Sequence, residues 1–320
     1  MIRMRLSHAS ATLSNLKTHL ASIVNLFSVR SRIFYVDYPV HSNIGDLLIN
    51  LGTEQFFGDY RIPIHRRYSV MDMPPLDRLD VDEDTTFLCH GGGNFGDLYP
   101  KHQMLRESLL DRFPLARIVF LPQSLFYTSE SALQMSLQKI RRHPNCHILV
   151  RDRESLVALQ SAKISCCSLM PDMAHYLWGT LKTTQDALPG REMYLLRQDM
   201  EARSLTSDEE ETCAHHSLDW NKVVSIRHRL LAGSVYWTLR KAANRLPQGL
   251  NAPAWYIARN QMIADSVALF SIHERIHTNR LHAMLLALLL GRDVTASDNS
   301  YGKLSRYITT WLAQEVQPDI

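Results

Sequence analysis

Short apolar runs alternate with helix-length amphipathic segments along the first half of the chain. Apolar runs of strand length occur at 33–36, 86–89, 117–121 and 146–150. A polar or glycine-containing turn follows each run, and apolar positions at helical spacing then predict helices over about 47–57, 104–113 and 129–143. This repeated strand–turn–helix order is typical of a mostly parallel sheet with helices on both faces. The pattern therefore predicts an α/β fold.

The pattern is interrupted over 181–190, where polar residues, a proline and a glycine indicate a linker. Beyond the linker, further strands are predicted at 192–196, 222–226, 267–272 and 294–296, and helices at 252–269, 283–290 and 304–316. We therefore expect two Rossmann-like domains, at 33–180 and 191–303, that face a cleft in a GT-B-like arrangement. The C-terminal residues 304–320 are expected to form a helix that packs back across the domains.

The first 32 residues form a separate basic segment, for which we predict an amphipathic helix. The segment contains no Asp or Glu, and its apolar residues recur at helical spacing: Leu13, Leu16, Leu20, Ile23, Val24 and Phe27. Such a helix can lie on an anionic membrane surface, or it can dock on its own domain. A secretory signal is not indicated, because polar residues interrupt the apolar positions and no small-residue cleavage site follows.

Composition narrows the class of protein. At 320 residues, 45% of them hydrophobic and 21% charged, the chain is expected to be globular and soluble. A net charge of +3 with no basic run interleaved with aromatics argues against a nucleic-acid partner. Five irregularly spaced cysteines fit neither a disulfide framework nor a zinc pattern, so we expect reduced thiols and a cytoplasmic protein. No run approaches the ~20 apolar residues that a membrane span requires.

The segment 271–303, SIHERIHTNRLHAMLLALLLGRDVTASDNSYGK, carries the most informative chemistry. A polar, basic turn precedes an apolar helix that ends before Gly291, in the position of a C-terminal cap. Arg280 and His282 are predicted where the turn enters this helix, and a helix N-terminus attracts anions. Lys303, in the loop that follows, is expected to contribute a further cation, so the segment predicts a binding site for phosphate or carboxylate. The histidine could move a proton near neutral pH.

Two loops of the first domain follow predicted strands and also carry polar groups or glycines. The first is His41-Ser42-Asn43-Ile44-Gly45-Asp46, and the second is His90-Gly91-Gly92-Gly93-Asn94-Phe95-Gly96-Asp97. Three consecutive glycines allow the backbone to approach a ligand, although the spacing is neither the dinucleotide-binding fingerprint nor a Walker loop. Asn43 or Asp46 could instead only cap a helix, and the glycines could be purely structural. A third strand end presents Arg151 and Arg153, at most one of which is expected to point into a cleft.

The order and separation of these motifs resemble those of the polysaccharide pyruvyl transferases. The resemblance rests on Asn43-Ile44-Gly45-Asp46, Gly91-Gly92-Gly93-Asn94-Phe95-Gly96-Asp97, Arg280-Leu281-His282 and Asp298-Asn299-Ser300-Tyr301-Gly302-Lys303, and it covers most of 35–315. Enzymes of this family move the enolpyruvyl unit of phosphoenolpyruvate onto a sugar, usually as a ketal. The resemblance thus implies phosphoenolpyruvate as co-substrate and no cofactor.

The resemblance also implies roles for individual residues. On the donor side, phosphoenolpyruvate would be bound by Arg197, Arg280, Leu281 and Lys303, with His282 as general acid and base. On the acceptor side, the sugar would be held by Asn43, Gly45, Asp46, Gly92, Gly93, Asn94 and Asp97. Arg197 could alternatively form a structural ion pair with Asp199 or Glu201, and His282 could be a core histidine. No metal is expected, because neighbouring arginines would repel a cation from His273, His277 and His282.

Partners and alternatives follow from the same chemistry. The acceptor is expected to be a lipid-linked oligosaccharide or a nucleotide sugar, and the basic N-terminal helix would suit peripheral contact with the inner face of a membrane. A nucleotide-sugar glycosyltransferase would use the same architecture without phosphoenolpyruvate. A non-catalytic glycan-binding protein is the third hypothesis, although the Arg-His-Lys cluster exceeds what sugar binding requires.

Overall fold

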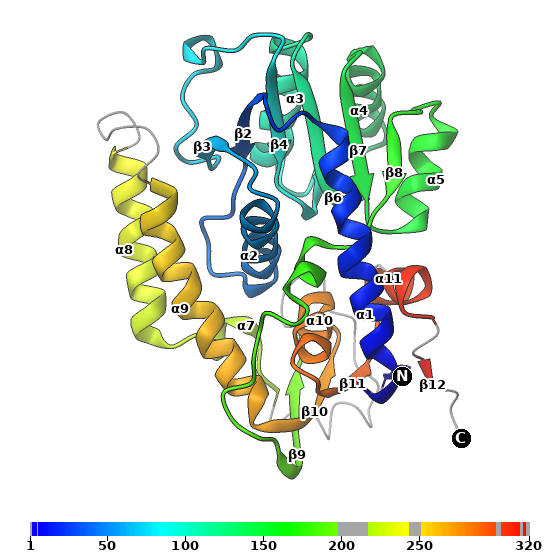
Figure 1. Ribbon diagram of the computed structural model, residues 1–320, viewed down its shortest axis with the longest axis vertical. Helices are drawn as coiled ribbons and strands as arrows, with labels where there is room; N and C mark the ends of the chain where they lie inside the picture. Colours follow the sequence, from blue (N-terminus) through cyan, green and yellow to red (C-terminus); the bar gives the residue numbers. More distant parts are fainter. Residues whose placement is uncertain are drawn as a thin grey trace.

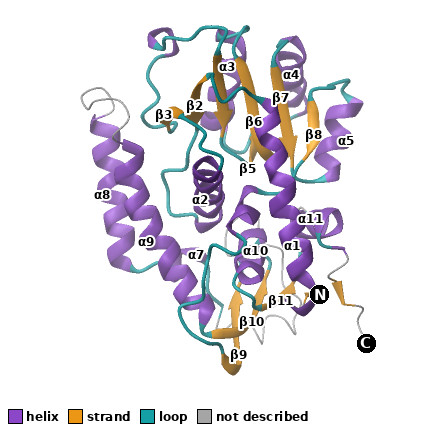
Figure 2. Cartoon of the chain, in the orientation of Figure 1, coloured by secondary structure: helices purple, strands orange, loops and turns teal. Residues whose placement is uncertain are grey.

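The computed structural model describes residues 2–4, 6–197, 217–242, 251–298, 302–313 and 316–317. Within these residues, two β-sheets and the helices around them form an α/β fold (Figures 1 and 2). The predicted fold class is thereby confirmed at the level of α/β.

The first sheet contains the parallel strands β2 (Arg32–Val36), β3 (Ile64–Tyr68), β4 (Thr85–Cys89), β6 (Arg117–Phe126), β7 (Cys146–Val150) and β8 (Cys167–Leu169). Their order is β3-β2-β4-β6-β7-β8, and β5 (Gly92–Gly96) pairs with the end of β6. Helices α2 (Ile44–Asp59), α3 (Pro100–Arg112), α4 (Glu130–Arg142) and α5 (Arg153–Ser161) connect them. The strand order reverses direction at β2 and β4, and ligands of open α/β sheets bind beyond the carboxyl ends of the strands at such a point.

The second sheet has the order β12-β1-β11-β10-β9. Strands β9 (Leu188–Leu195), β10 (His273–Thr278) and β11 (Asp293–Ala296) are parallel, whereas β1 (Ile2–Met4) and β12 (Val316–Gln317) extend the sheet antiparallel. The helices of this half are α7 (Trp220–Val223), α8 (Ile226–Ala242), α9 (Asn251–Ser271), α10 (Leu281–Leu289) and α11 (Lys303–Trp311). Short 3₁₀ helices η1 (Ala21–Leu26), η2 (Leu76–Arg78) and η3 (Met173–Leu177) complete the described elements.

The predicted strand at 267–272 is wrong, because most of this run belongs to α9. Its apolar residues Val267 and Phe270 form the buried face of that helix. The strand is the next segment, β10, which we predicted as a polar turn. Its polar side chains are tolerated there because Arg275 and His277 both bind Glu192 of β9, at 2.9 and 2.8 Å.

Three other element predictions differ from the structure. The run 222–226 is not a strand: α7 ends within it and α8 begins at its last residue. The predicted linker 181–190 runs into a strand, since β9 already begins at Leu188. The terminal helix α11 ends at Trp311, earlier than predicted.

The N-terminal segment begins with β1, which joins the second sheet, and continues as α1 (Leu6–Leu20). Its apolar positions face the protein interior: Leu13, Leu20 and Ile23 are inaccessible to solvent. Helix α1 packs against η3 and α10 (Figure 1). The described part of this helix is therefore docked on its own chain.

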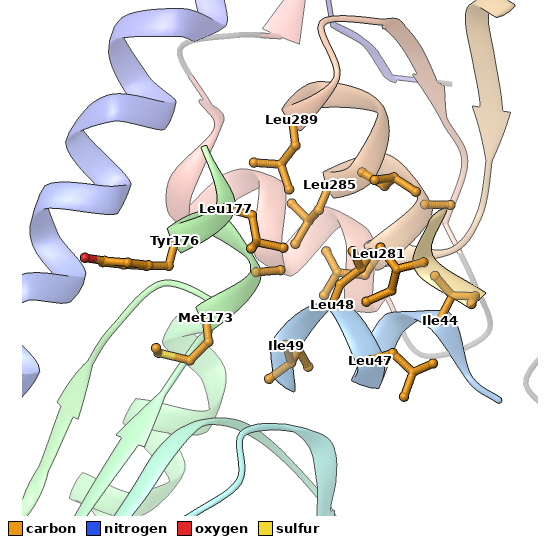
Figure 3. Packing of buried hydrophobic residues seen from close by; sticks show 14 of the residues in the cluster. Ile44, Leu47, Leu48, Ile49, Met173, Tyr176, Leu177, Leu281, Leu285 and Leu289 are labelled. Carbon is orange, nitrogen blue, oxygen red and sulfur yellow. The ribbon is translucent and has the colours of Figure 1, made fainter. Parts of the chain in front are cut away.

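A shared apolar core joins the two sheets. Figure 3 shows Ile44 and Leu48 of α2, Met173 and Leu177 of η3, and Leu281, Leu285 and Leu289 of α10 in one buried cluster. Helix α2 lies so close to η3 that a Cβ atom on Gly52 would be 2.2 Å from the carbonyl oxygen of Met173. A second apolar cluster fills the other face of the first sheet. The shared core fixes α2 against α10, and their N-termini meet beside the pocket described next.

Candidate active site

A pocket of about 290 Å³ lies where the N-termini of α2 and α10 meet. One side, here called the α2 wall, consists of His41, Asn43, Asp46, Gly93, Tyr99, His102 and Arg151. The opposite side, the α10 wall, consists of Arg197, Trp220, Arg280, Leu281, His282, Lys303 and Leu304. Eight of the twelve predicted site residues line this pocket, although they come from both halves of the chain.

Helix α10 places Arg280 and His282 at the pocket. Residues 281–289 are almost all apolar and buried, and Gly291 adopts a left-handed backbone (φ 72°) just beyond the helix, as a C-terminal cap requires. Arg280 occupies the N-cap position, and its Nη2 donates to Asp219 Oδ2 at 2.7 Å. Because both side chains are largely buried, this ion pair fixes the direction of the guanidinium.

His282 is paired with a buried carboxylate that sequence reasoning missed. Its Nε2 lies 3.3 Å from Asp172 Oδ2, and Arg151 Nη1 donates to the same oxygen at 2.6 Å. Burial alone would raise the pKa of the Asp172 carboxyl, but His282 and Arg151 outweigh burial and hold that pKa far below its ordinary value. Asp172 is therefore held as an anion, and it orients the imidazole of His282.

Gly45 lies under the His282 ring rather than on the pocket surface. A Cβ atom added to Gly45 would be 2.5 Å from His282 Nδ1, so only glycine leaves room for the imidazole. Gly93 has a similar role on the α2 wall, where an added Cβ atom would be 2.9 Å from Arg151 Nη2 and 3.8 Å from Lys303 Nζ. Both glycines thus permit close approach of functional side chains to the backbone.

Four cationic side chains converge on the pocket. Arg151 comes from the end of β7, Arg197 from the end of β9, Arg280 from the N-cap of α10 and Lys303 from the first turn of α11. Asp298 positions Lys303, because its Oδ1 accepts from the Leu304 N–H at 3.2 Å and caps the helix. Arginine forks and a lysine ammonium in one cavity are suited to a ligand with several negative charges.

On the α2 wall, Asn43 both caps a helix and lines the pocket. Its Oδ1 accepts from the Gly45 N–H at 3.1 Å, and its Nδ2 donates to Asp46 Oδ2 at 2.9 Å. His41 Nε2 lies 3.6 Å from the same carboxylate oxygen. The capping alternative is therefore correct for Asn43, and it does not remove the residue from the pocket.

A second histidine–carboxylate pair stands behind the α2 wall. Asp37 is buried just after β2, and its backbone is in the left-handed region (φ 68°). Its Oδ1 lies 2.6 Å from His102 Nδ1, and its Oδ2 accepts from the buried Arg106 at 2.8 Å. Burial would raise the pKa of Asp37, but Arg106 and His102 lower it below its ordinary value. A non-glycine residue held in this conformation is strained, and such strain is concentrated at functional sites.

Some predicted site residues lie elsewhere. Asp97 does not line the pocket: its carboxylate accepts from the backbone N–H groups of Thr128 and Ser129 and braces the entry to α4. Gly92 (φ 122°) lies near Asp46 and Ile49 behind the pocket surface. The side chain of Asn94, like the whole of Asp199, Glu201 and 299–301, lies outside the described residues.

In the described part of the chain, no three His, Cys, Asp or Glu side chains are grouped so that they could hold a metal ion. His273 Nδ1 donates to the Leu269 carbonyl oxygen at 2.7 Å. His277 stacks on Tyr194 and binds Glu192. Neither histidine reaches His282.

Among the described helices, none has the length and apolar character to cross a membrane.

Comparisons with known proteins define the class. The family model for polysaccharide pyruvyl transferases matches residues 43–301. The chain is 34% identical over 303 residues to the "Putative pyruvyl transferase EpsO" of Bacillus subtilis (strain 168), covering 93% of this chain and 91% of that protein. It is 27% identical to Pyruvyl transferase 1 of Schizosaccharomyces pombe, covering 89% of this chain and 71% of that protein. The chain therefore belongs to the polysaccharide pyruvyl transferase family, and it is an enzyme, a pyruvyl transferase.

A solved structure supports the fold. The crystal structure of a functionally uncharacterized protein from Klebsiella pneumoniae subsp. pneumoniae NTUH-K2044 is similar, with a TM-score of 0.60 and coverage of 93% of this chain and 95% of that one. At 16% identity, this likeness concerns the fold alone.

Proposed function

We propose that this enzyme transfers the pyruvyl unit of phosphoenolpyruvate to two hydroxyls of one sugar in an exopolysaccharide or cell-surface glycan precursor. The product is a pyruvate ketal, and phosphate is released. Family membership supports pyruvyl transfer, and one observation supports the choice of donor. Four cationic side chains and a carboxylate-bound histidine line the same pocket.

The reaction has a definite proton balance. Protonation of the donor CH₂ carbon gives a methyl group and an oxocarbenium-like centre at C2, which one sugar hydroxyl attacks. The C2–O bond to phosphate then breaks, and the second hydroxyl attacks the same carbon. Two hydroxyl protons are lost, one is taken up by carbon, and the other leaves with phosphate or solvent. The site must therefore both deliver and accept protons.

In this proposal His282 delivers the proton to carbon. Asp172 holds and orients its imidazole, as the carboxylate does in other acid–base pairs. Arg197, Arg280 and Lys303 would bind the carboxylate and phosphate of the donor, with Leu281 packing at the base of the site. Arg151 joins them, although it also holds Asp172.

The α2 wall is proposed to hold the acceptor sugar. Asn43 and Asp46 offer an amide and a carboxylate to sugar hydroxyls, and the glycine-rich segment at Gly93 lets the sugar approach the backbone. His102, oriented by Asp37, is a candidate acceptor for a hydroxyl proton. The acceptor is proposed to be a lipid-linked oligosaccharide or a nucleotide sugar, met at the cytoplasmic face of a membrane.

The two halves are proposed to correspond to two Rossmann-like domains in a GT-B-like arrangement. Strand order β3-β2-β4-β6-β7-β8 in the first sheet and the parallel set β9-β10-β11 in the second support this assignment. The pocket between α2 and α10 would then be the interdomain site. The shared apolar core shows that the halves are also in direct contact.

Product analysis tests the proposal. Incubation with phosphoenolpyruvate and a panel of glycan precursors should release phosphate and give a product whose methyl protons are those of a pyruvate ketal by NMR. Arg280→Ala should abolish both signals, whereas Arg275→Ala, which alters ion pairs of the second sheet with Glu192 of β9 and Asp293 of β11, should not. Turnover of UDP- or GDP-sugars without phosphoenolpyruvate would instead establish the glycosyltransferase alternative.

A further inference from the structure

Helix α8 presents an apolar stripe to solvent. Ile226, Leu230 and Trp237 are 66%, 69% and 55% exposed. Their spacing of four and seven residues places them on one face of the helix, within about 40° of one another at 100° per residue. Single exposed apolar residues are common on protein surfaces. Three on one face of a helix form an apolar face that points to solvent, and such a face often marks an interaction site.

The opposite face of α8 is the one that packs on the protein. Ala232 is buried there, and His228 Nδ1 lies 2.6 Å from Asp265 of α9. Helices α8 and α9 lie side by side along one edge of the molecule (Figure 1). The exposed stripe is therefore additional to what folding needs, and no described residue covers it.

Basic residues flank this stripe. Arg227, Arg229 and Lys241 are exposed on the same helix. The surrounding sequence, 220–264, contains seven Lys and Arg residues and no Asp or Glu, so the remainder of the chain is net negative despite the overall charge of +3. Arg259 is buried against Asn50, so the positive charges described as exposed on α7 and α8 are Lys222, Arg227, Arg229 and Lys241.

We propose that the outer face of α8 docks on an anionic lipid membrane. Two forces hold a helix in a membrane interface: burial of apolar side chains at the acyl boundary and attraction of Lys and Arg to anionic headgroups. The outer face of α8 has side chains for both, and its tryptophan is a residue type enriched at membrane interfaces. A second copy of the chain fits less well, because two such faces would bring like charges together. The proposal concerns a different helix from α1, whose apolar positions are buried.

The position of α8 relates this surface to the pocket. Trp220 lines the α10 wall and begins α7, and α8 starts only six residues later. Asp219, which holds Arg280, immediately precedes Trp220. An acceptor anchored in the membrane beneath α8 would therefore lie near the pocket entrance. This last connection rests on the proposed function, whereas membrane docking itself does not.

Vesicle flotation of the full-length protein, without substrates, tests the docking. The wild type should float with phosphatidylcholine vesicles that contain phosphatidylglycerol and not with phosphatidylcholine alone, and added salt should weaken the association. The double variant Leu230→Ser, Trp237→Ser should bind roughly tenfold or more weakly. A matched double variant, Met135→Ser, Val157→Ser, removes two comparably exposed apolar residues from α4 and α5 and should bind as the wild type does.

Three results would overturn the proposal. The first is absence of wild-type binding to the anionic vesicles, and the second is equal binding by the two double variants. The third is a wild-type dimer in analytical ultracentrifugation that the Leu230→Ser, Trp237→Ser variant converts to monomer, because the face would then be a contact between copies. Turnover of a soluble acceptor should be the same in all variants, so that loss of docking and failure of the proposed reaction are separated.

Discussion

The two walls of the pocket each hold a histidine in the same way, but they differ in the groups around it. On each wall a histidine is held by a buried aspartate that an arginine also binds: His282, Asp172 and Arg151 in one case, His102, Asp37 and Arg106 in the other. The walls differ in their remaining groups. Arg197, Arg280 and Lys303 lie on the α10 wall, whereas the α2 wall presents Asn43 and Asp46 beside Arg151, which is paired with Asp172. The proposal of an anionic donor on the α10 wall and sugar hydroxyls on the α2 wall rests on this difference.

The largest effect is expected at His282. His282→Asn removes the proposed proton donor, so kcat should fall by about 10²- to 10⁴-fold. The affinity for phosphoenolpyruvate should change little, because Arg197, Arg280 and Lys303 remain. Steady-state kinetics and titration of the donor check both parts. His277→Asn is the matched control, since His277 lies on β10 and binds Glu192. A fully active His282→Asn enzyme would remove this histidine from the mechanism.

Gly45→Ala should disturb the same histidine without touching substrate. Its methyl group would clash with His282 Nδ1 and displace the imidazole from Asp172. We expect kcat to fall by roughly 10- to 100-fold, in line with small misplacements of catalytic groups, with a loss of stability of about 1–3 kcal/mol. Gly58→Ala, on the same helix with open space around it, should leave both quantities nearly unchanged. Equal behaviour of the two variants would contradict the packing argument.

His102→Gln tests whether the α2 wall also moves a proton. We expect kcat to decrease about tenfold and the dependence of kcat on pH to lose one titration, while donor affinity is unchanged. A variant that weakens donor binding instead would place His102 on the donor side. An unaltered pH profile would make His102 a structural residue.

The smallest predicted effect concerns stability in acid. The pKa values of Asp172 and Asp37 are lower in the folded protein than in the unfolded chain, whose aspartates titrate near pH 4. Their stabilising contribution is therefore complete above about pH 4 and is lost as the pH falls further. Urea unfolding between neutral and acidic pH should show this decline. Asp172→Asn should give a shallower decline than the wild type, and an identical slope would refute the assignment.

Local features of the sequence predicted the α/β fold and marked part of the pocket. The alternation of strands and helices predicted the first sheet. Motifs at strand ends and helix N-termini, weighed together with the family resemblance, marked Asn43, Gly93, Arg280 and His282 as candidates, and the structure brings these four residues to one pocket. The aspartates that hold the histidines of the pocket in place could not be predicted from local sequence features. Asp172 lies 110 residues from His282, and Asp37 lies 65 residues from His102. Only the folded chain brings such pairs together.

The helices α1 and α8 illustrate a second limit. Both are basic and amphipathic in sequence, but the pattern does not state which face meets the protein. The structure buries the apolar face of α1 and exposes an apolar stripe of α8. Similarly, β10 was missed because its polar side chains pair across the sheet with Glu192, a partner 85 residues from His277.

The most direct test of the account is a calorimetric titration of phosphoenolpyruvate into the wild type, Arg280→Ala and His102→Gln, with UDP-sugars as control ligands. We predict binding of phosphoenolpyruvate to the wild type and to His102→Gln, and loss of that binding in Arg280→Ala. A UDP-sugar that serves as acceptor should bind Arg280→Ala as well as it binds the wild type. Binding of UDP-sugars in place of phosphoenolpyruvate, or loss of donor binding in His102→Gln but not in Arg280→Ala, would contradict the assignment of the donor to the α10 wall.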